Sequence, residues 1–238
     1  MKVIKADHDR RIPIHGVPGP VSRPVDIDQS ITGFRDLRSL RIYRFDEGSV
    51  IDGDAEQDEV FVVVLAGSVE FTVSGTQSDH FELSAAGGLP ARGCVAYLPP
   101  RHTYRLRSHT ESEVAYARAT PDAPREPRAF APGLTPASPG VTVVIEEYAH
   151  AERLRLQLLH VDTRAGQRDV ALFDDGPATN QLILHVRTEP EEGVATAFAS
   201  NGASVPLRSW DSCALTRVER PQLHLAAGAT AVVLIVSV

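Results

Sequence analysis

The chain has 238 residues and a formal net charge of -7. This length allows two domains of about 100 residues each, with a hydrophobic core in each. The acidic balance argues against the basic surface that nucleic-acid binding requires, so no nucleic-acid partner is expected.

The residue types argue against further classes of chemistry. Lys2 and Lys5 are the only lysines, so a Schiff-base lysine in a pocket is nearly ruled out. Two cysteines cannot form a disulfide framework, and no apolar run reaches the length of a membrane span. The N-terminal residues lack the apolar stretch of a signal peptide. We therefore expect a cytoplasmic protein without a membrane partner.

Taken in chain order, the expected elements are almost all β-strands. Residues 1–35 contain several prolines and are expected to form a loop-like N-terminal arm. Residues 36–120 contain short segments rich in β-branched and aromatic residues, bounded by Gly, Pro, Ser or Asp, which is typical of strands. Residues 121–140 are rich in proline and predict a stiff linker. Strand-like segments resume over residues 141–238.

One tight turn is predicted within the first set of strands. The segments Val60–Leu65 and Ser68–Val73 are joined by Ala66-Gly67, which favours a β-hairpin. No segment has the periodicity of a long amphipathic helix. Short strands at even spacing indicate a sandwich or barrel in each half.

The second half repeats the first at a distance of 119 residues, since Arg92–Tyr116 aligns with Asp211–Ile235 without a gap. The matched positions are Cys94 with Cys213, Ala96 with Leu215, Leu106 with Leu225, and Val114 with Val233. A repeat of this length is a whole domain rather than a solenoid unit. The chain is therefore predicted to contain two copies of one β-rich fold.

Two stretches resemble the paired motifs of the cupin superfamily. Glu59–Gly67 (EVFVVVLAG) resembles the acidic residue, apolar strand and glycine turn that close the first motif. Gly93–Tyr104 (GCVAYLPPRHTY) resembles the second motif, in which a glycine leads into a proline turn and a strand. Together with the repeat, these motifs resemble a bicupin. That resemblance implies an all-β fold of two tandem jelly-roll barrels, residues 36–120 and 141–238.

Within bicupins, the first half is most similar to the N-terminal barrel of 5-deoxy-glucuronate isomerases. The similarity lies in Asp58–Val60, Leu65–Val69, Tyr97–Pro100, Thr103-Tyr104 and Glu113–Ala115. It implies a metal-dependent aldose–ketose isomerase whose ligands, a His-x-His pair, a Glu and a later His, lie in the C-terminal barrel. This chain has no His-x-His pair. Its second half instead faintly resembles the HutD family, through Asp175–Pro177, Gln181–Arg187 and Ala231–Val238.

The cupin resemblance implies a metal site of three histidines and a carboxylate. Counted by the family spacing, the histidine positions of the first half fall on Gly53, Ala55 and Tyr104, and Glu59 alone remains. In the second half the four positions fall on Asp174, Gly176, Asn180 and Leu223, which form no site. No cofactor is therefore expected.

A divalent metal is the alternative. Glu56, Glu59 and His102 are weak candidate ligands for a hard cation. The acidic run that contains the two glutamates, from Asp52 to Glu59, is otherwise expected to be a solvated loop.

The mouth of the first barrel is the expected ligand pocket, because an eight-stranded barrel encloses room for one small ligand. Glu59 and His102 are the candidate catalytic residues, as base and as proton donor or cation ligand. Tyr104, Arg101 and Arg105 are the candidate ligand-binding residues. The alternatives are a surface-loop role for His102 and a packing role for Tyr104.

Two functions are consistent with these residues. The first is a bicupin with degenerate metal sites that binds a small polar ligand, such as a sugar acid, in a non-catalytic or regulatory role. The alternative is a sugar-acid isomerase, with or without a metal. By analogy with other jelly rolls, we expect a homodimer.

Overall fold

The computed structural model describes the chain except residues 15, 75–77, 86–92, 122–124, 148–150, 152, 166–168, 172–180, 190, 192–193, 199–201 and 217–221. The described residues form an almost entirely β structure, with one short helix, α1 (Gln29–Thr32), and a 3-10 turn, η1 (Thr163–Ala165). None of the described helical segments could cross a membrane. The all-β prediction is confirmed.

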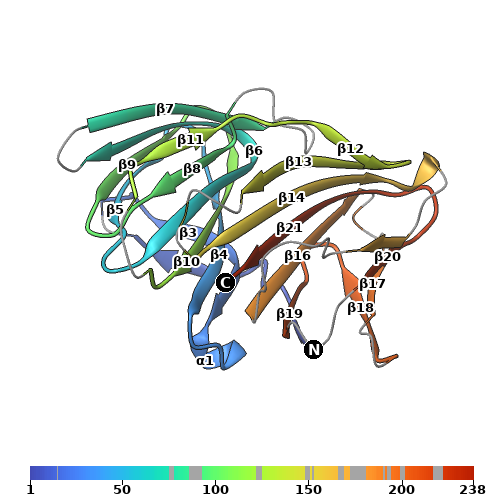
Figure 1. Cartoon of the computed structure of the whole chain (residues 1–238). Helices are drawn as coiled ribbons and strands as arrows, with labels where there is room; N and C mark the ends of the chain where they lie inside the picture. Colours follow the sequence, from blue (N-terminus) through green and yellow to red (C-terminus); the bar gives the residue numbers. More distant parts are fainter. Residues whose placement is uncertain are drawn as a thin grey trace.

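The first half forms one barrel with two walls (Figure 1). The first wall has the strand order β11 (Arg128–Phe130), β8 (Val95–Leu98), β6 (Glu59–Ser74), β10 (Ser112–Ala119), β4 (Leu37–Phe45), β3 (Pro20–Asp28) and β2 (Arg11–Pro13). The second wall consists of β7 (Ser78–Ala85), the C-terminal part of β6, β9 (Thr103–Ser108) and β5 (Val50–Asp54).

The predicted hairpin at Ala66-Gly67 is wrong, because β6 continues through this dipeptide as one 16-residue strand. Residues before Gly67 pair with β8 and β10, and residues from Gly67 onward pair with β7 and β9. Gly67 has a φ of 85°, and a Cβ there would collide with the Glu111 carbonyl oxygen and with Ser112. The glycine therefore marks a corner at which one strand passes from the first wall to the second.

The second half also contains two sheets. The larger has the strand order β1 (Lys2–Ile4), β19 (Ser212–Thr216), β16 (Gln181–Glu189), β21 (Thr230–Ser237), β14 (Arg155–Asp162), β13 (Val141–Glu147) and β12 (Thr135–Ser138). The smaller has the order β15 (Asp169–Ala171), β20 (Gln222–Leu225), β17 (Val194–Phe198) and β18 (Ser204–Arg208).

The structure bears out the internal repeat. With an offset of 119 residues, β8 corresponds to β19, β9 to β20, and β10 to β21. The matched pairs Ala96/Leu215, Leu106/Leu225 and Val114/Val233 each face the interior of their own barrel. The two cysteines differ, since Cys213 faces the second interior while Cys94 packs in the apolar layer between the two halves.

That apolar layer joins the two barrels. Phe61, Val63 and Leu65 of β6 pack there with side chains of β14, β16 and β21, whereas the alternating Val60, Val62 and Val64 face the first barrel's interior. A strand with both faces buried is apolar at every position rather than at alternate ones. This explains the continuous apolar run in β6.

The expected arm and linker are parts of the sheets. Within 1–35, β3 pairs with β4, and Pro24 lies at a register shift of that pairing, where a missing N–H is tolerated. The first strand, β1, pairs with β19 of the second half. Within 121–140, β11 pairs with β8 and β12 pairs with β13. The barrels thus extend into both predicted connecting segments.

Candidate functional site

Glu59 begins β6 on the face that points toward the second half, on the same side as Phe61. Its side chain is fully buried. The backbone amides of Arg153 and Leu154 donate hydrogen bonds to Oε1 over 2.8 and 2.5 Å, and the Tyr97 hydroxyl donates to Oε2 over 3.2 Å. Burial and the Glu59 carboxylate together raise the pKa of Tyr97, which keeps this hydroxyl a donor. The carboxylate is thus held between the barrels rather than at a barrel mouth.

His102 and Arg101 lie in the turn between β8 and β9. This turn interlocks with residues 55–58, because the Ala55 amide donates to the His102 carbonyl over 2.9 Å and the Arg101 amide donates to the Glu56 carbonyl over 2.8 Å. The His102 ring is half-buried, and Nδ1 donates to the Pro100 carbonyl over 3.0 Å. Arg101 is exposed, and its Nε donates to Gln57.

Arg105 and Tyr104 occupy opposite faces of β9. Arg105 is exposed and forms two hydrogen bonds to Asp52, of 2.7 and 2.9 Å, on the outer surface of the barrel. The Asp52 carboxylate raises the pKa of Arg105, so the guanidinium stays charged. Tyr104 points inward, and its ring lies 5.2 Å from that of Phe71 and 5.8 Å from that of Tyr116. Burial raises the pKa of Tyr104 to about 12.

The three candidate metal ligands do not form a group. Glu56 is an exposed side chain, Glu59 is buried toward the second half, and the described residues that could jointly hold an ion do not include these two or His102. The Glu56–Glu59–His102 site is therefore not supported by the geometry.

The histidine positions implied by the cupin spacing are filled by packing. The Tyr104 ring covers Gly53 so closely that a Cβ at Gly53 would lie 2.6 Å from the tyrosine hydroxyl. Ala55 is fully buried in the apolar interior. The counted positions of the first barrel therefore do not fit a cupin metal, because none of them carries an imidazole and packed side chains cover Gly53 and Ala55.

The contact between Gly53 and Tyr104 can be tested by adding a methyl group at Gly53. Gly53→Ala should lower the free energy of unfolding by roughly 1–3 kcal/mol, the usual cost of overpacking, and Tyr104→Leu in the same chain should recover part of that loss. Gly133→Ala is the matched control, because its Cβ would make an ordinary 3.8 Å contact with Thr135. Urea unfolding measures all three variants, and equal costs at Gly53 and Gly133 would contradict a filled interior.

In the second half, Asp174, Gly176 and Asn180 lie outside the described residues, as does Asp175–Pro177. The fourth counted position, Leu223, is buried in the apolar cluster of the second barrel's interior. His185 is buried in the opposite direction, where Nδ1 lies 3.0 Å from the Ser212 hydroxyl. Burial lowers the pKa of His185 to about 3, so its imidazole is neutral.

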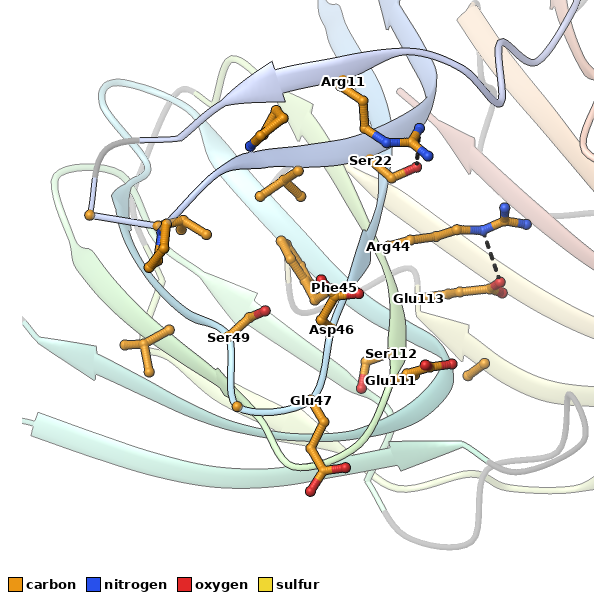
Figure 2. A pocket seen from close by; sticks show the side chains of 18 residues that line it. Arg11, Ser22, Arg44, Phe45, Asp46, Glu47, Ser49, Glu111, Ser112 and Glu113 are labelled. Carbon is orange, nitrogen blue, oxygen red and sulfur yellow. Dashed lines mark hydrogen bonds and ion pairs between the residues drawn. The ribbon is translucent and has the colours of Figure 1, made fainter.

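A cavity of about 1020 Å3 lies at the other end of the first barrel (Figure 2). It is bounded by the segment that connects β2 to β3 and by the turn between β4 and β5. That turn is bonded to the end of β9, where the Gly48 amide donates to the Ser108 carbonyl over 2.8 Å. His102 precedes β9, so the cavity and the predicted mouth are separated by the strand's length, roughly 20 Å.

The cavity lining mixes charges, hydroxyls and apolar surface. Its polar side chains are Arg11, Ser22, Arg44, Asp46, Glu47, Ser49, Glu111, Ser112 and Glu113. Val17, Val21 and Phe45 line it with apolar groups. Arg11 is exposed and donates to the Ser22 hydroxyl over 3.1 Å. Such a lining suits a small polar molecule with several hydroxyl or carboxylate groups.

Arg44 and Glu113 connect this cavity to the second half. The Arg44 guanidinium lies 4.2 Å from the ring centroid of Trp210, and its Nε lies 3.3 Å from Glu113. Glu113 also pairs with Arg187 of β16. Burial raises the pKa of Glu113, and the two arginines oppose that shift. The cavity wall is therefore held by an ion-pair cluster that spans both barrels.

A second cavity, of about 410 Å3, contains Arg38, Arg41, Glu56, Asp58 and Arg118. Neither this cavity nor the larger one is lined by Glu59, His102, Tyr104, Arg101 or Arg105. Sequence reasoning missed the larger cavity because its arginines occur in no motif. The polar turn at Asp46–Ser49, which lines the cavity, was the only part of it that the sequence marked.

Residues 22–139, just under half of the chain, match the KduI/IolB family. No curated protein matches the chain in sequence. Among solved structures, an IolB-like protein from Salmonella typhimurium LT2 has a TM-score of 0.71 at 13% identity, covering 90% of this chain and 88% of that protein.

Two further structures have the same fold. Oxalate decarboxylase of Bacillus subtilis, which contains Mn(II) centres, has a TM-score of 0.68 at 8% identity, covering 99% of this chain and 76% of that one. YlbA from E. coli has a TM-score of 0.63 at 10% identity, covering 99% and 89%. At these identities the similarity concerns the fold alone.

Proposed function

We propose that this chain is a bicupin and that it binds a small sugar acid or related polar ligand in the Arg11–Arg44 cavity without a metal at the cupin positions. The proposed role is binding or regulation rather than catalysis. The observation that carries the proposal is the cavity of about 1020 Å3 with two guanidinium groups, four carboxylates, three serine hydroxyls and an apolar wall.

The absence of space at the cupin metal positions supports the metal-independent part of this proposal. Tyr104 covers Gly53, and Ala55 is packed in the interior, so neither of these counted positions offers an imidazole to a metal. The cavity instead offers charge-assisted hydrogen bonds from arginine, which bind carboxylates strongly. A sugar acid combines one carboxylate with several hydroxyls and would use both types of group.

Binding is tested by calorimetry with D-glucuronate, using D-glucose as the neutral comparison. We expect saturable binding of D-glucuronate, weaker binding of D-glucose, and a loss of about tenfold in Arg11→Ala, which corresponds to one charge-assisted hydrogen bond. Arg105→Ala is the matched control, because Arg105 is an exposed, ion-paired arginine at a distance from the cavity. Absence of saturable binding, or an equal loss in both variants, would contradict the proposal.

A sugar-acid isomerase is the second candidate, and the match to the KduI/IolB family favours it. In this alternative Glu59 would act as the base and His102 as the proton donor. Glu59 would first have to leave the amides of Arg153 and Leu154. The alternative therefore requires a rearrangement between the barrels that the binding role does not need.

Proton NMR of D-glucuronate incubated with the protein in D2O distinguishes the two candidates. An isomerase that moves a proton from carbon 2 to carbon 1 is expected to produce ketose signals and to introduce deuterium at carbon 1 of the ketose, and Glu59→Gln would abolish both. A binding protein leaves the D-glucuronate spectrum unchanged over the same period. Ketose formation that is insensitive to both Glu59→Gln and His102→Ala would remove these residues from the mechanism.

A further inference from the structure

The outer face of the second wall of the first barrel carries a cluster of imidazoles and carboxylates that the proposed ligand cavity does not include. Glu70 lies on β6, His80 and Glu82 lie on β7, and His109 lies in the turn after β9. The ligand atoms of Glu70, Glu82 and His109 all lie within 4.8 Å of one another. Three separate segments of the chain therefore bring nitrogen and oxygen donors to one point.

The backbone holds these donors in place. Glu70 and Glu82 are directly opposite each other in the β6–β7 ladder, and Thr72 and His80 form the next outward-facing pair. The His109 amide donates to the Ser68 carbonyl over 2.9 Å, which fixes the turn against β6. The register and this turn, rather than flexible side chains alone, determine the spacing of the cluster.

Three nitrogen–oxygen distances within the cluster are short. His109 Nε2 lies 3.6 Å from Glu82 Oε2, His80 Nε2 lies 3.3 Å from Glu82 Oε1, and His80 Nδ1 lies 3.7 Å from Glu70 Oε1. Bonds of about 2.0–2.2 Å in a tetrahedron place neighbouring ligand atoms roughly 3.3–3.6 Å apart. An ion takes one atom from each residue, so the set of Glu70, Glu82 and His109, whose ligand atoms lie within 4.8 Å, contracts to these separations when the ion binds.

The charge arrangement favours a cation at this point. Two carboxylates opposite each other in an antiparallel pair repel and destabilise the ladder. Arg107 is the Cα partner of Glu70 on β9, on the side of β6 away from Glu82. A divalent ion between Glu70 and Glu82 would neutralise both carboxylates and would use the neutral form of the His109 imidazole.

We propose that Glu70, Glu82 and His109 form a binding site for one divalent transition-metal ion, with Zn2+ as the expected ion and water as its fourth ligand. One imidazole nitrogen and two carboxylate oxygens with one open position form a ligand set that suits zinc. The bound ion joins the β6–β7 hairpin to the β9–β10 turn. This site is on the barrel surface and is independent of the proposed sugar-acid cavity.

Calorimetry with ZnCl2 tests the site in the untagged, full-length chain after removal of metal with a chelator. We expect one Zn2+ per chain, and binding about 100-fold weaker in His109→Gln and in Glu82→Gln. His224→Gln is the matched control, because His224 is an exposed histidine paired with a single carboxylate, Asp169, in the second half. We expect it to bind Zn2+ as the unmodified chain does.

The fold of each variant is checked by circular dichroism, so that a weaker site is not confused with an unfolded chain. The proposal would be overturned by the absence of saturable Zn2+ binding in the unmodified chain. It would equally be overturned if folded His109→Gln and Glu82→Gln bound Zn2+ as tightly as the unmodified chain.

Discussion

Replacing Glu59 by alanine is expected to lower the free energy of unfolding by about 4 kcal/mol. The substitution removes the acceptor for the amides of Arg153 and Leu154 and for the Tyr97 hydroxyl. Each buried donor left without an acceptor costs roughly 1–3 kcal/mol, and hydrogen bonds to a charged group are the stronger kind. Urea-induced unfolding of the purified chain measures the change.

Glu56→Ala is the matched control for this prediction. Glu56 lies three residues earlier with its side chain 70% exposed, so its removal should change stability by no more than about 0.5 kcal/mol. Tyr97→Phe removes the hydroxyl's hydrogen bonds to Glu59 and to the Arg125 backbone and should cost roughly 1–2 kcal/mol. If Glu59→Ala were as mild as Glu56→Ala, the carboxylate would not be a structural link between the barrels.

Replacing Trp210 by alanine is expected to cost about 3–5 kcal/mol, the usual range for removing a large buried aromatic side chain. Trp210 is 1% exposed and packs in the apolar layer between the halves. Its ring also contacts the guanidinium groups of Arg44 and Arg187 and the imidazole of His185. The loss therefore combines apolar burial with cation–π contacts.

Trp210→Phe separates these contributions. The indole Nε1 is buried with no hydrogen-bond partner among the described residues, so phenylalanine removes an unsatisfied donor and keeps an aromatic ring. We expect less than half the cost of Trp210→Ala, measured by the same unfolding experiment. Equal costs for the two variants would indicate that the ring's aromatic character contributes nothing at this position.

The repeat and the strands could be predicted from sequence because both depend on local patterns. Side chains alternate between the two faces of a strand, which predicts that Leu106 and Val114 face inward. The offset of 119 residues predicts the same orientation for Leu225 and Val233. The Ala66-Gly67 prediction was wrong because a glycine that permits a hairpin also permits a corner within one strand. Pairing partners, which are non-local, decide between the two.

The candidate site was less predictable. The sequence correctly placed Glu59 at the start of an apolar strand. Because β6 is buried on both faces, its apolar pattern does not indicate which face points into the barrel. The packing of the second half against β6 decides that Glu59 faces Arg153 and Leu154. Tyr104 was predicted to face inward, and it does.

The sequence by itself determined the all-β class, the duplication, and the absence of histidines at the cupin positions of the first barrel. Each of these is a property of residue types at fixed spacings along the chain. The tertiary structure alone decided that Arg11, Arg44 and Glu113 line one cavity and that Glu70, Glu82 and His109 meet on one surface. These groups come from different strands and turns, and only the register and closure of the barrel set their distances in space.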